Sequence, residues 1–255
     1  MHSEQAFSGI RAILLDKDGT LFDFRRTWLP LLFAGAREVA GNDEGLALEL
    51  VRAGGYDPDT DRFRADGPIA AGNALDMAES WHAVLMRHYG ADAARREAGG
   101  PPVPGKAELV KEIDRVSRER GVDTSVPVTA LRQLFERLTR AGIALGLATS
   151  DSTAAAYAAL EREHISPFFT YVTGYDGPGG RKPAASVARA FFEPLHIPPS
   201  RVMIVGDTWH DLGMARDCGC IAVAVLTGAI GCDDLEPYAD VVLESIAGLP
   251  ELIGL

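Results

Sequence analysis

The stretch "RAILLDKDGTLFDF", residues 11–24, decides how the rest of the chain is interpreted. Its apolar run, Ala12 to Leu15, leads directly into two acidic residues, Asp16 and Asp18, with Lys17 between them. Continuous rather than alternating hydrophobicity is typical of a strand covered on both faces, as in a parallel sheet. Residues i and i+2 of an extended chain point the same way, so both acids can face one cavity.

Further apolar runs of this kind recur along the chain and end in small or acidic residues. They are "IALGLATSD" at 143–151, "FFTYVTG" at 168–174, "RVMIVGD" at 201–207 and "CIAVAVLTG" at 220–228. Helical patterns lie between them, at residues 128–142, 152–164 and 211–219. Strand alternating with helix predicts an α/β protein, with a doubly wound, Rossmann-like parallel sheet as its core.

The segment from 25 to 121 breaks this alternation and carries helix-like stretches with no convincing strand. These are "WLPLLFAGAREVAG", "NALDMAESWHAVLMRHYG" and "KAELVKEIDRVSRER". We therefore expect an inserted all-helical domain at 25–121, with an α/β core formed by 1–24 and 122–255. Pro and Gly predict a loop at 98–106, and turn formers predict a linker at 121–127.

Length and charge limit the classes of function. A chain of 255 residues can form one large domain or two smaller ones, and 47% hydrophobic with 24% charged residues is ordinary for a globular protein. The formal net charge of -11 argues against binding nucleic acid or an anionic membrane by bulk charge. The N-terminus shows no basic start before a long apolar stretch, so we expect a cytoplasmic protein without a membrane partner.

The cysteines and one histidine are weak metal candidates. Cys218, Cys220 and Cys232 are an odd and sparse set, which does not suit a disulfide framework. No second Cys or His pair matches Cys218-Gly-Cys220, and no second histidine lies at ligand spacing from His210. We expect a structural role for the cysteines and a place on a helix surface for His210.

Polar residues follow the predicted strands at the ends where ligands bind in open α/β sheets. Asp16 ends the first strand, Thr149 and Ser150 follow the second, and Asp207 follows the fourth. Residues more than a hundred positions apart in sequence are therefore expected to meet at one edge of the sheet.

Carboxylates gathered there need a counter-charge. Asp16, Asp18, Asp207 and Asp211 would repel one another unless one is protonated or a cation lies nearby. Mg²⁺ suits such a set, because it binds one or two carboxylates and completes its shell with water and phosphate oxygens. Taken singly, an Asp-x-Asp-Gly is common in turns and a Gly-Asp after a strand is a frequent helix cap. Their joint placement at strand ends predicts a magnesium and phosphate site.

Four segments resemble the motifs of the haloacid dehalogenase superfamily, and specifically its aspartate-nucleophile phosphatases. They are "DKDGT" at 16–20, the strand ending in Thr149, Lys182 in "GGRKPAAS" and "GDTWHD" at 206–211. The helical insertion resembles the C1 cap of this family, and the phosphoglycolate phosphatase-like branch is the nearest comparison. One departure is Lys17, where an apolar residue is commoner; we expect its backbone rather than its side chain to line the site.

The resemblance implies a role for each matching residue. Asp16 would be the nucleophile and Asp18 the general acid and base. Thr149, Ser150 and Lys182 would bind the phosphate. The metal ligands would be Asp16, the backbone carbonyl of Asp18, Asp207 and, through water, Asp211.

The function implied is that of a Mg²⁺-dependent phosphomonoesterase acting on a small phosphorylated metabolite through an aspartyl-phosphate. The substrate would be phosphoglycolate-like or a sugar phosphate, and the protein a monomer or homodimer. Arg25 and Arg26 stand at the entrance of the insertion, where they would bind a second anionic group of the substrate or form a solvated flank. Trp209 would pack or contact substrate.

Other functions fit parts of the same pattern. A phosphomutase of this fold would use the same residues but return the phosphate to a bound sugar. A dehalogenase needs neither the second aspartate nor the acid cluster at 206–211. A non-catalytic protein that binds phosphorylated metabolites would have no use for a nucleophile with its acid partner.

Overall fold

The computed structural model describes residues 7–41, 43–90, 103–119 and 125–255. The chain divides into two compact units, Met1–Thr27 with Ser125–Leu255 and Trp28–Thr124. We call the first the core unit and the second the helical unit. The expected boundaries, after residues 24 and 121, lie a few residues earlier at both junctions.

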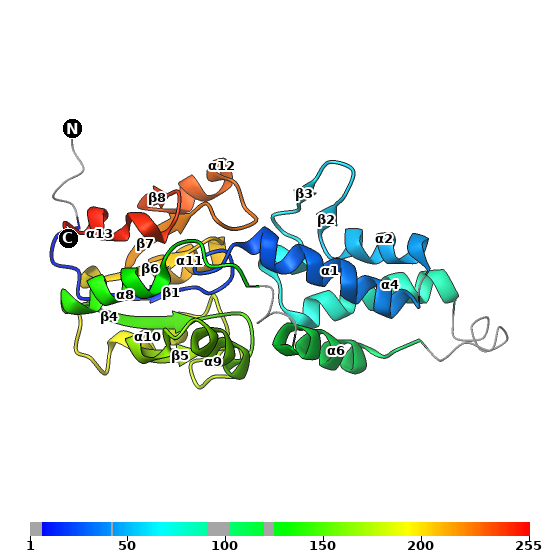
Figure 1. Ribbon diagram of the computed structural model, residues 1–255, viewed down its shortest axis with the longest axis horizontal. Helices are drawn as coiled ribbons and strands as arrows, with labels where there is room; N and C mark the ends of the chain where they lie inside the picture. The colour runs from blue at the N-terminus through cyan, green and yellow to red at the C-terminus, as the bar shows by residue number, and fades with distance from the viewer. Residues whose placement is uncertain (1–6, 42, 91–102, 120–124) are drawn as a thin grey trace. The chain divides into compact units, whose positions relative to one another are not determined.

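The core unit is built on one six-stranded sheet, in the order β5-β4-β1-β6-β7-β8 (Figure 1). Every neighbouring pair is parallel. The strands are β1 (Ala12–Leu15), β4 (Ala144–Ala148), β5 (Phe169–Thr173), β6 (Val202–Gly206), β7 (Ile221–Val225) and β8 (Val241–Leu243). The predicted doubly wound α/β core is confirmed.

Helices follow the strands along the chain. They are α8 (Leu131–Arg140), α9 (Thr153–Arg162), α10 (Ala185–Phe192), α11 (Trp209–Cys218), α12 (Cys232–Leu235) and α13 (Leu249–Leu252). Short 3-10 turns occur at Ser166–Phe168, Pro199–Arg201, Glu236–Tyr238 and Ile246–Gly248.

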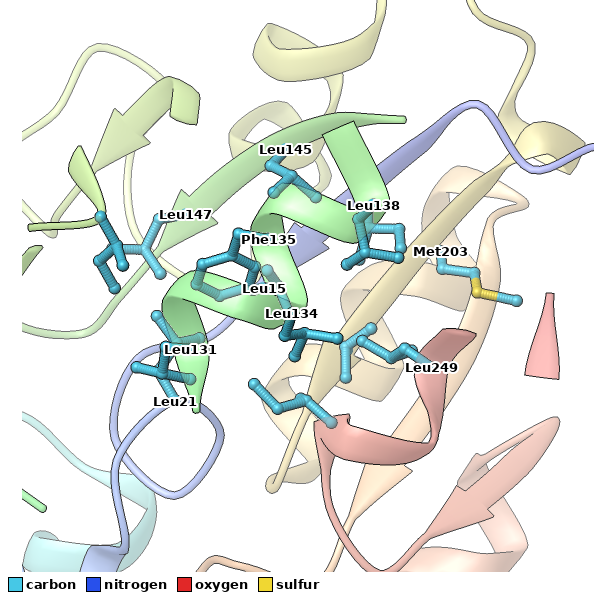
Figure 2. Packing of buried hydrophobic residues seen from close by; sticks show 14 of the residues in the cluster. Leu15, Leu21, Leu131, Leu134, Phe135, Leu138, Leu145, Leu147, Met203 and Leu249 are labelled. Atoms are coloured by element: carbon cyan, nitrogen blue, oxygen red, sulfur yellow. The ribbon is translucent and has the colours of Figure 1, made fainter. Parts of the chain in front are cut away.

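One face of the sheet is covered by α8, whose apolar residues recur every three or four positions. Figure 2 shows Leu134, Phe135 and Leu138 of this helix over Leu15 and other strand residues. On the opposite face, a Cβ at Gly146 would lie 2.9 Å from both Leu14 and the Phe191 ring of α10. Because both faces are covered, strands β1, β4, β6 and β7 are apolar throughout rather than alternating.

The helical unit has its own hydrophobic cluster. Its helices are most of α1 (Phe24–Ala40), whose first four residues belong to the core unit, and α2 (Glu44–Ala53), α3 (Pro68–Ala71), α4 (Ala74–Tyr89) and α6 (Lys106–Glu119). The buried Trp81 of α4 donates its indole N–H to the Leu50 carbonyl of α2 at 2.9 Å. Across the described ranges, the helices lack the length and apolar character needed to cross a membrane.

The expectation that the insertion is all-helical is wrong in one detail. Two short antiparallel strands, β2 (Tyr56–Asp57) and β3 (Arg62–Phe63), pair within it. The Asp57 carboxylate accepts hydrogen bonds from Asp59 N at 3.0 Å and Thr60 Oγ1 at 2.8 Å, which supports the chain reversal. Strands of two residues are too short to show an alternating pattern.

Two predicted connections are described only in part. Of the loop at 98–106, residues 98–102 lie outside the described residues, and 103–105 have no regular structure. Of the linker at 121–127, residues 121–124 also lie outside, and Pro127 forms a bridge to Phe22.

Candidate active site

The central strand carries the first acidic residue of the site. β1 lies between β4 and β6. Its last residue, Leu15, pairs with Leu147 of β4 and with Val205 of β6. Asp16 follows it at once and donates its backbone N–H to the Val205 carbonyl of β6 at 2.9 Å. Thr149 and Asp207 follow β4 and β6 directly. The carboxyl ends of three adjacent strands therefore supply the polar residues that the sequence pointed to.

Three carboxylates meet at this edge. Asp16, Asp207 and Asp211 each offer an oxygen, and these oxygens lie within 4.8 Å of one another. The side chains are buried, at 7%, 1% and 1% exposure. A Cβ at Gly206 would lie 2.2 Å from the Asp211 carboxyl carbon, so the glycine lets α11 bring that carboxylate against the strand end.

Lys182 pairs with two of these acids. It lies between β5 and α10, and its ammonium donates to Asp211 Oδ1 at 2.8 Å and to Asp16 Oδ1. Its side chain is 4% exposed. The other Asp211 oxygen accepts a hydrogen bond from Thr208 Oγ1 at 2.7 Å. Asp211 thus has a fixed orientation, with both oxygens engaged by protein donors.

Burial dominates the electrostatics of the cluster. Loss of water raises the pKa of Asp16 to about 7, although the Lys182 ammonium acts in the opposite direction. Burial, with repulsion from Asp16 and Asp211, raises the pKa of Asp207 well above its ordinary value. Burial by itself would lower the pKa of Lys182, but attraction to the carboxylates outweighs it and raises that pKa. The single ammonium of Lys182 cannot balance three carboxylates, so the cluster carries excess negative charge whenever all three are ionised.

The cluster fits a hard divalent cation. Its donors are carboxylate oxygens, the ligands that Mg²⁺ prefers. Within the part of the chain that the structure describes, the buried Asp207 Oδ2 accepts no hydrogen bond. A buried acceptor without a donor is costly, and a cation would remove that cost. Cβ atoms at Gly19 and Gly228 would lie 2.2 and 1.9 Å from the same oxygen, so two glycines allow the backbone to close around it.

The side chain of Lys17 does more than the sequence indicated. We expected only its backbone to line the site, but its buried ammonium lies 2.7 Å from Asp18 Oδ2 and 2.9 Å from Asp151 Oδ2. Burial alone would lower the pKa of Lys17, yet attraction to Asp151 and Asp18 raises it. Along a strand the side chain of residue 17 points away from those of 16 and 18, and the chain turns immediately afterwards. Its partner Asp151 lies on another loop, and no local pattern in the sequence specifies that contact.

The candidate phosphate ligands on the β4 loop differ in exposure. Thr149 is 4% exposed, and its hydroxyl oxygen accepts the Asp151 backbone N–H at 3.1 Å. A hydroxyl that accepts one hydrogen bond can still donate its own hydrogen. Ser150 is partly exposed. Thr149 therefore has a fixed oxygen with a hydrogen available for an anion.

The candidate substrate contacts are more exposed than this buried set. Arg25 and Arg26 are exposed in the first turn of α1, and the Arg26 backbone N–H donates to Asp23 Oδ1 at 2.8 Å. Trp209 and His210 begin α11 and are partly exposed, with ring centres 6.3 Å apart. Cys218 and Cys220 are buried free thiols, and burial raises the pKa of Cys220 to about 12.

Two residues of the candidate site, Asp151 and Gly228, are not predicted from the sequence. In the sequence, Asp151 and Gly228 stand only as the last residues of the apolar runs at 143–151 and 220–228. A signal for Asp151 did exist, because it follows Thr149 by two positions, as Asp18 follows Asp16. No local pattern marks Gly228, whose role depends on a contact with Asp207.

In open α/β sheets ligands bind at the carboxyl edge, and in this protein that edge carries a carboxylate cluster paired with a lysine. The model of the haloacid dehalogenase-like hydrolases matches residues 10–219, and the chain belongs to this family. This confirms the resemblance noted in the four motifs.

Relatives and solved structures agree with this assignment. A phosphoglycolate phosphatase of Escherichia coli O157:H7 is 28% identical over 259 residues, covering 98% of this chain and 94% of that protein. The structure of a predicted phosphoglycolate phosphatase from Haemophilus somnus has a TM-score of 0.69 at 17% identity, covering 96% and 98%. A structure assigned provisionally as a β-phosphoglucomutase, from Thermotoga maritima, has a TM-score of 0.58 at 19% identity, covering 92% and 94%.

At these identities the two solved structures establish the fold alone. The family match and the phosphatase relatives together identify the chain as a phosphatase of the haloacid dehalogenase superfamily. The enzyme class predicted from the sequence is therefore confirmed.

Proposed function

We propose that this phosphatase is a Mg²⁺-dependent phosphomonoesterase that forms an aspartyl-phosphate on Asp16. The observation that carries the proposal is the position of the Asp16 carboxylate. It directly follows the central strand, pairs with Lys182 and shares a buried cluster with Asp207 and Asp211. A carboxylate so held is suited to attack an electrophile at one fixed point.

In the first step an Asp16 oxygen forms a bond to phosphorus while the bond from phosphorus to the substrate oxygen breaks. Asp18 gives a proton to that departing oxygen. In the second step water attacks the same phosphorus, Asp18 takes the proton from water, and the bond to Asp16 breaks to restore the carboxylate. Two displacements replace one difficult displacement.

Lys182, Thr149 and Ser150 would hold the transferred group. The Lys182 ammonium supplies positive charge beside the nucleophile, and the Thr149 hydroxyl supplies a hydrogen-bond donor. Phosphoryl transfer depends mainly on such charge compensation and positioning.

Asp16, Asp207 and the backbone carbonyl of Asp18 would hold the magnesium ion directly. When bound, the ion supplies charge neutralisation at the phosphate oxygens. Asp211 would act through water, because Lys182 and Thr208 already engage its two oxygens. Its contribution is to orient the ammonium of Lys182.

The named relatives support a small substrate with a second anionic group, such as phosphoglycolate. A sugar phosphate fits the same chemistry. The exposed Arg25 and Arg26 would bind that second group. We propose that the helical unit acts as a cap that selects the leaving group and excludes water.

A phosphomutase is the second candidate, favoured by the fold shared with the Thermotoga maritima structure. It would use the same aspartates but return the phosphate to a bound sugar. Product analysis separates the two, because a phosphatase releases inorganic phosphate in proportion to substrate consumed.

The test is turnover of p-nitrophenyl phosphate with Mg²⁺ and with EDTA, by the wild type and by Asp16→Asn. We expect activity that requires Mg²⁺ and is lost in the variant. The matched control is Asp217→Asn, the same change on the exposed side of α11, which should leave activity intact. Undiminished activity in Asp16→Asn would refute the proposal, and a panel of phosphorylated metabolites then identifies the substrate.

A further inference from the structure

The ammonium of Lys17 joins two loops of the core unit. It lies 2.7 Å from Asp18 Oδ2, on the loop after β1, and 2.9 Å from Asp151 Oδ2, on the loop after β4. The three side chains are 6%, 13% and 19% exposed. An ammonium so far from water is retained only where carboxylates compensate for the lost hydration.

Both ends of this bridge are anchored by backbone hydrogen bonds. The Lys17 carbonyl accepts the Leu21 N–H at 2.9 Å, in the turn that follows Asp18. On the other loop, the Asp151 N–H donates to Thr149 Oγ1 at 3.1 Å, and its carbonyl accepts the Tyr175 N–H at 2.8 Å. Asp151 is thus a fixed point against which Lys17 can hold Asp18.

Phosphate binding does not account for Lys17. The positive charge beside the nucleophile comes from Lys182, which contacts Asp16 and Asp211. Lys17 contacts instead the residue that transfers protons. An ammonium group only donates hydrogen bonds, so the Asp18 oxygen that it holds must act as an acceptor. That arrangement suits Asp18 as a carboxylate, the form that takes a proton from water.

We propose that Lys17 is a positioning residue for the second step, in which water releases the phosphate from Asp16. By holding Oδ2, it fixes the Asp18 carboxylate so that its other oxygen receives the proton of the attacking water. The water oxygen then bonds to phosphorus, and the electron pair of the breaking bond returns to Asp16. The inference rests on the proposed function.

The test uses a charge-balanced variant, Lys17→Met/Asp151→Asn, which removes one positive and one negative side chain and leaves Asp18 without its bridge. Asp151→Asn alone keeps the contact between Lys17 and Asp18 and is the matched control. Lys17→Gln, whose side chain is one atom shorter but keeps a hydrogen-bond donor without the charge, is measured in parallel so that a folding defect of the double variant does not decide the result.

With p-nitrophenyl phosphate the first step needs no proton, because the nitrophenolate leaves as an anion. We therefore expect kcat to fall by about 10- to 100-fold, the usual effect of losing a group that orients a functional side chain. KM should fall in parallel, so that kcat/KM stays near the wild-type value. Phosphoenzyme trapped by acid from ³²P-labelled substrate should accumulate in the double variant, and less in Lys17→Gln and Asp151→Asn.

A merely structural role gives a different result. In that case kcat and kcat/KM fall together in the double variant and in Lys17→Gln, and no phosphoenzyme accumulates. That result, in an enzyme whose activity is lost in Asp16→Asn, overturns this inference alone. A wild type that is inactive, or an Asp16→Asn variant that stays active, overturns the proposed function as well.

Discussion

Replacing Gly228 by alanine tests how closely the site is built around Asp207. The new Cβ would lie 1.9 Å from Asp207 Oδ2 and 2.5 Å from its carboxyl carbon. To reach the 3.4 Å at which ordinary contact begins, the two groups must separate by about 1.5 Å. Asp207 is 1% exposed, so any displacement of its carboxylate takes place within the buried site.

The displacement should affect function more than folding. Overpacking of this kind costs about 1–3 kcal/mol, which corresponds to a fall in Tm of roughly 2–12 °C for a chain of this size. A shift of a catalytic group by 1 Å costs about 100-fold in rate. We expect kcat/KM to fall by about that factor, and the Mg²⁺ concentration for half-maximal activity to rise about 10- to 100-fold.

The assay is phosphate release across a Mg²⁺ titration, with the melting temperature measured on the same samples. The matched control is Gly213→Ala in α11, where a Cβ meets nothing within 4 Å among the described residues. Alanine is the better helix residue by about 0.5–1 kcal/mol, so this variant should keep its activity and melt no earlier. If Gly228→Ala keeps the wild-type Mg²⁺ requirement and rate, the close packing around Asp207 is not what holds the site.

Three further predictions concern charge and packing. Because the pKa of Asp16 rises from 3.8 to about 7 in the folded protein, the folded state binds the proton more tightly. Metal-free protein should therefore lose about 4 kcal/mol of stability as the pH rises between those values. Urea unfolding in EDTA measures this, and an equal slope in Asp16→Asn would contradict it. Lys182→Met leaves buried carboxylates uncompensated, so it should lower the free energy of unfolding by about 3–5 kcal/mol and abolish activity. Thermal melting compares it with Lys106→Met, which removes an exposed ion pair, and equal melting temperatures would refute the prediction. Trp81→Phe loses a hydrogen bond to a backbone carbonyl of α2 and should cost about 1–3 kcal/mol in urea; an unchanged unfolding curve would show that this bond adds nothing.

Much of the core fold could be predicted from local patterns. The apolar runs at 12–16, 143–151, 168–174, 201–207 and 220–228 each contain an observed strand. The helix predicted at 128–142 contains α8, because its apolar residues recur on one face. The edge strand β8 and the pair β2 and β3 were missed, since strands of two or three residues carry too little pattern.

The candidate site was predictable to the extent that it lies at strand ends. Asp16, Thr149 and Asp207 were expected at one edge because parallel strands end together, and the structure brings that edge together. Their chemical roles remain predictions. The ion pairs of the Lys17 side chain were not predictable, because they depend on a turn and on a partner in another loop.

The sequence by itself determined the order of strands and helices along the chain, and it determined that carboxylates follow the strand ends. Those features follow from spacings of two and of three or four residues, which any short window reveals. Only the tertiary structure decided which charges meet: Lys182 reaches Asp16 across 166 residues of chain, and Lys17 reaches Asp151 rather than water. Such contacts depend on the register of the sheet and on the exclusion of water, and neither is encoded in any single stretch of residues.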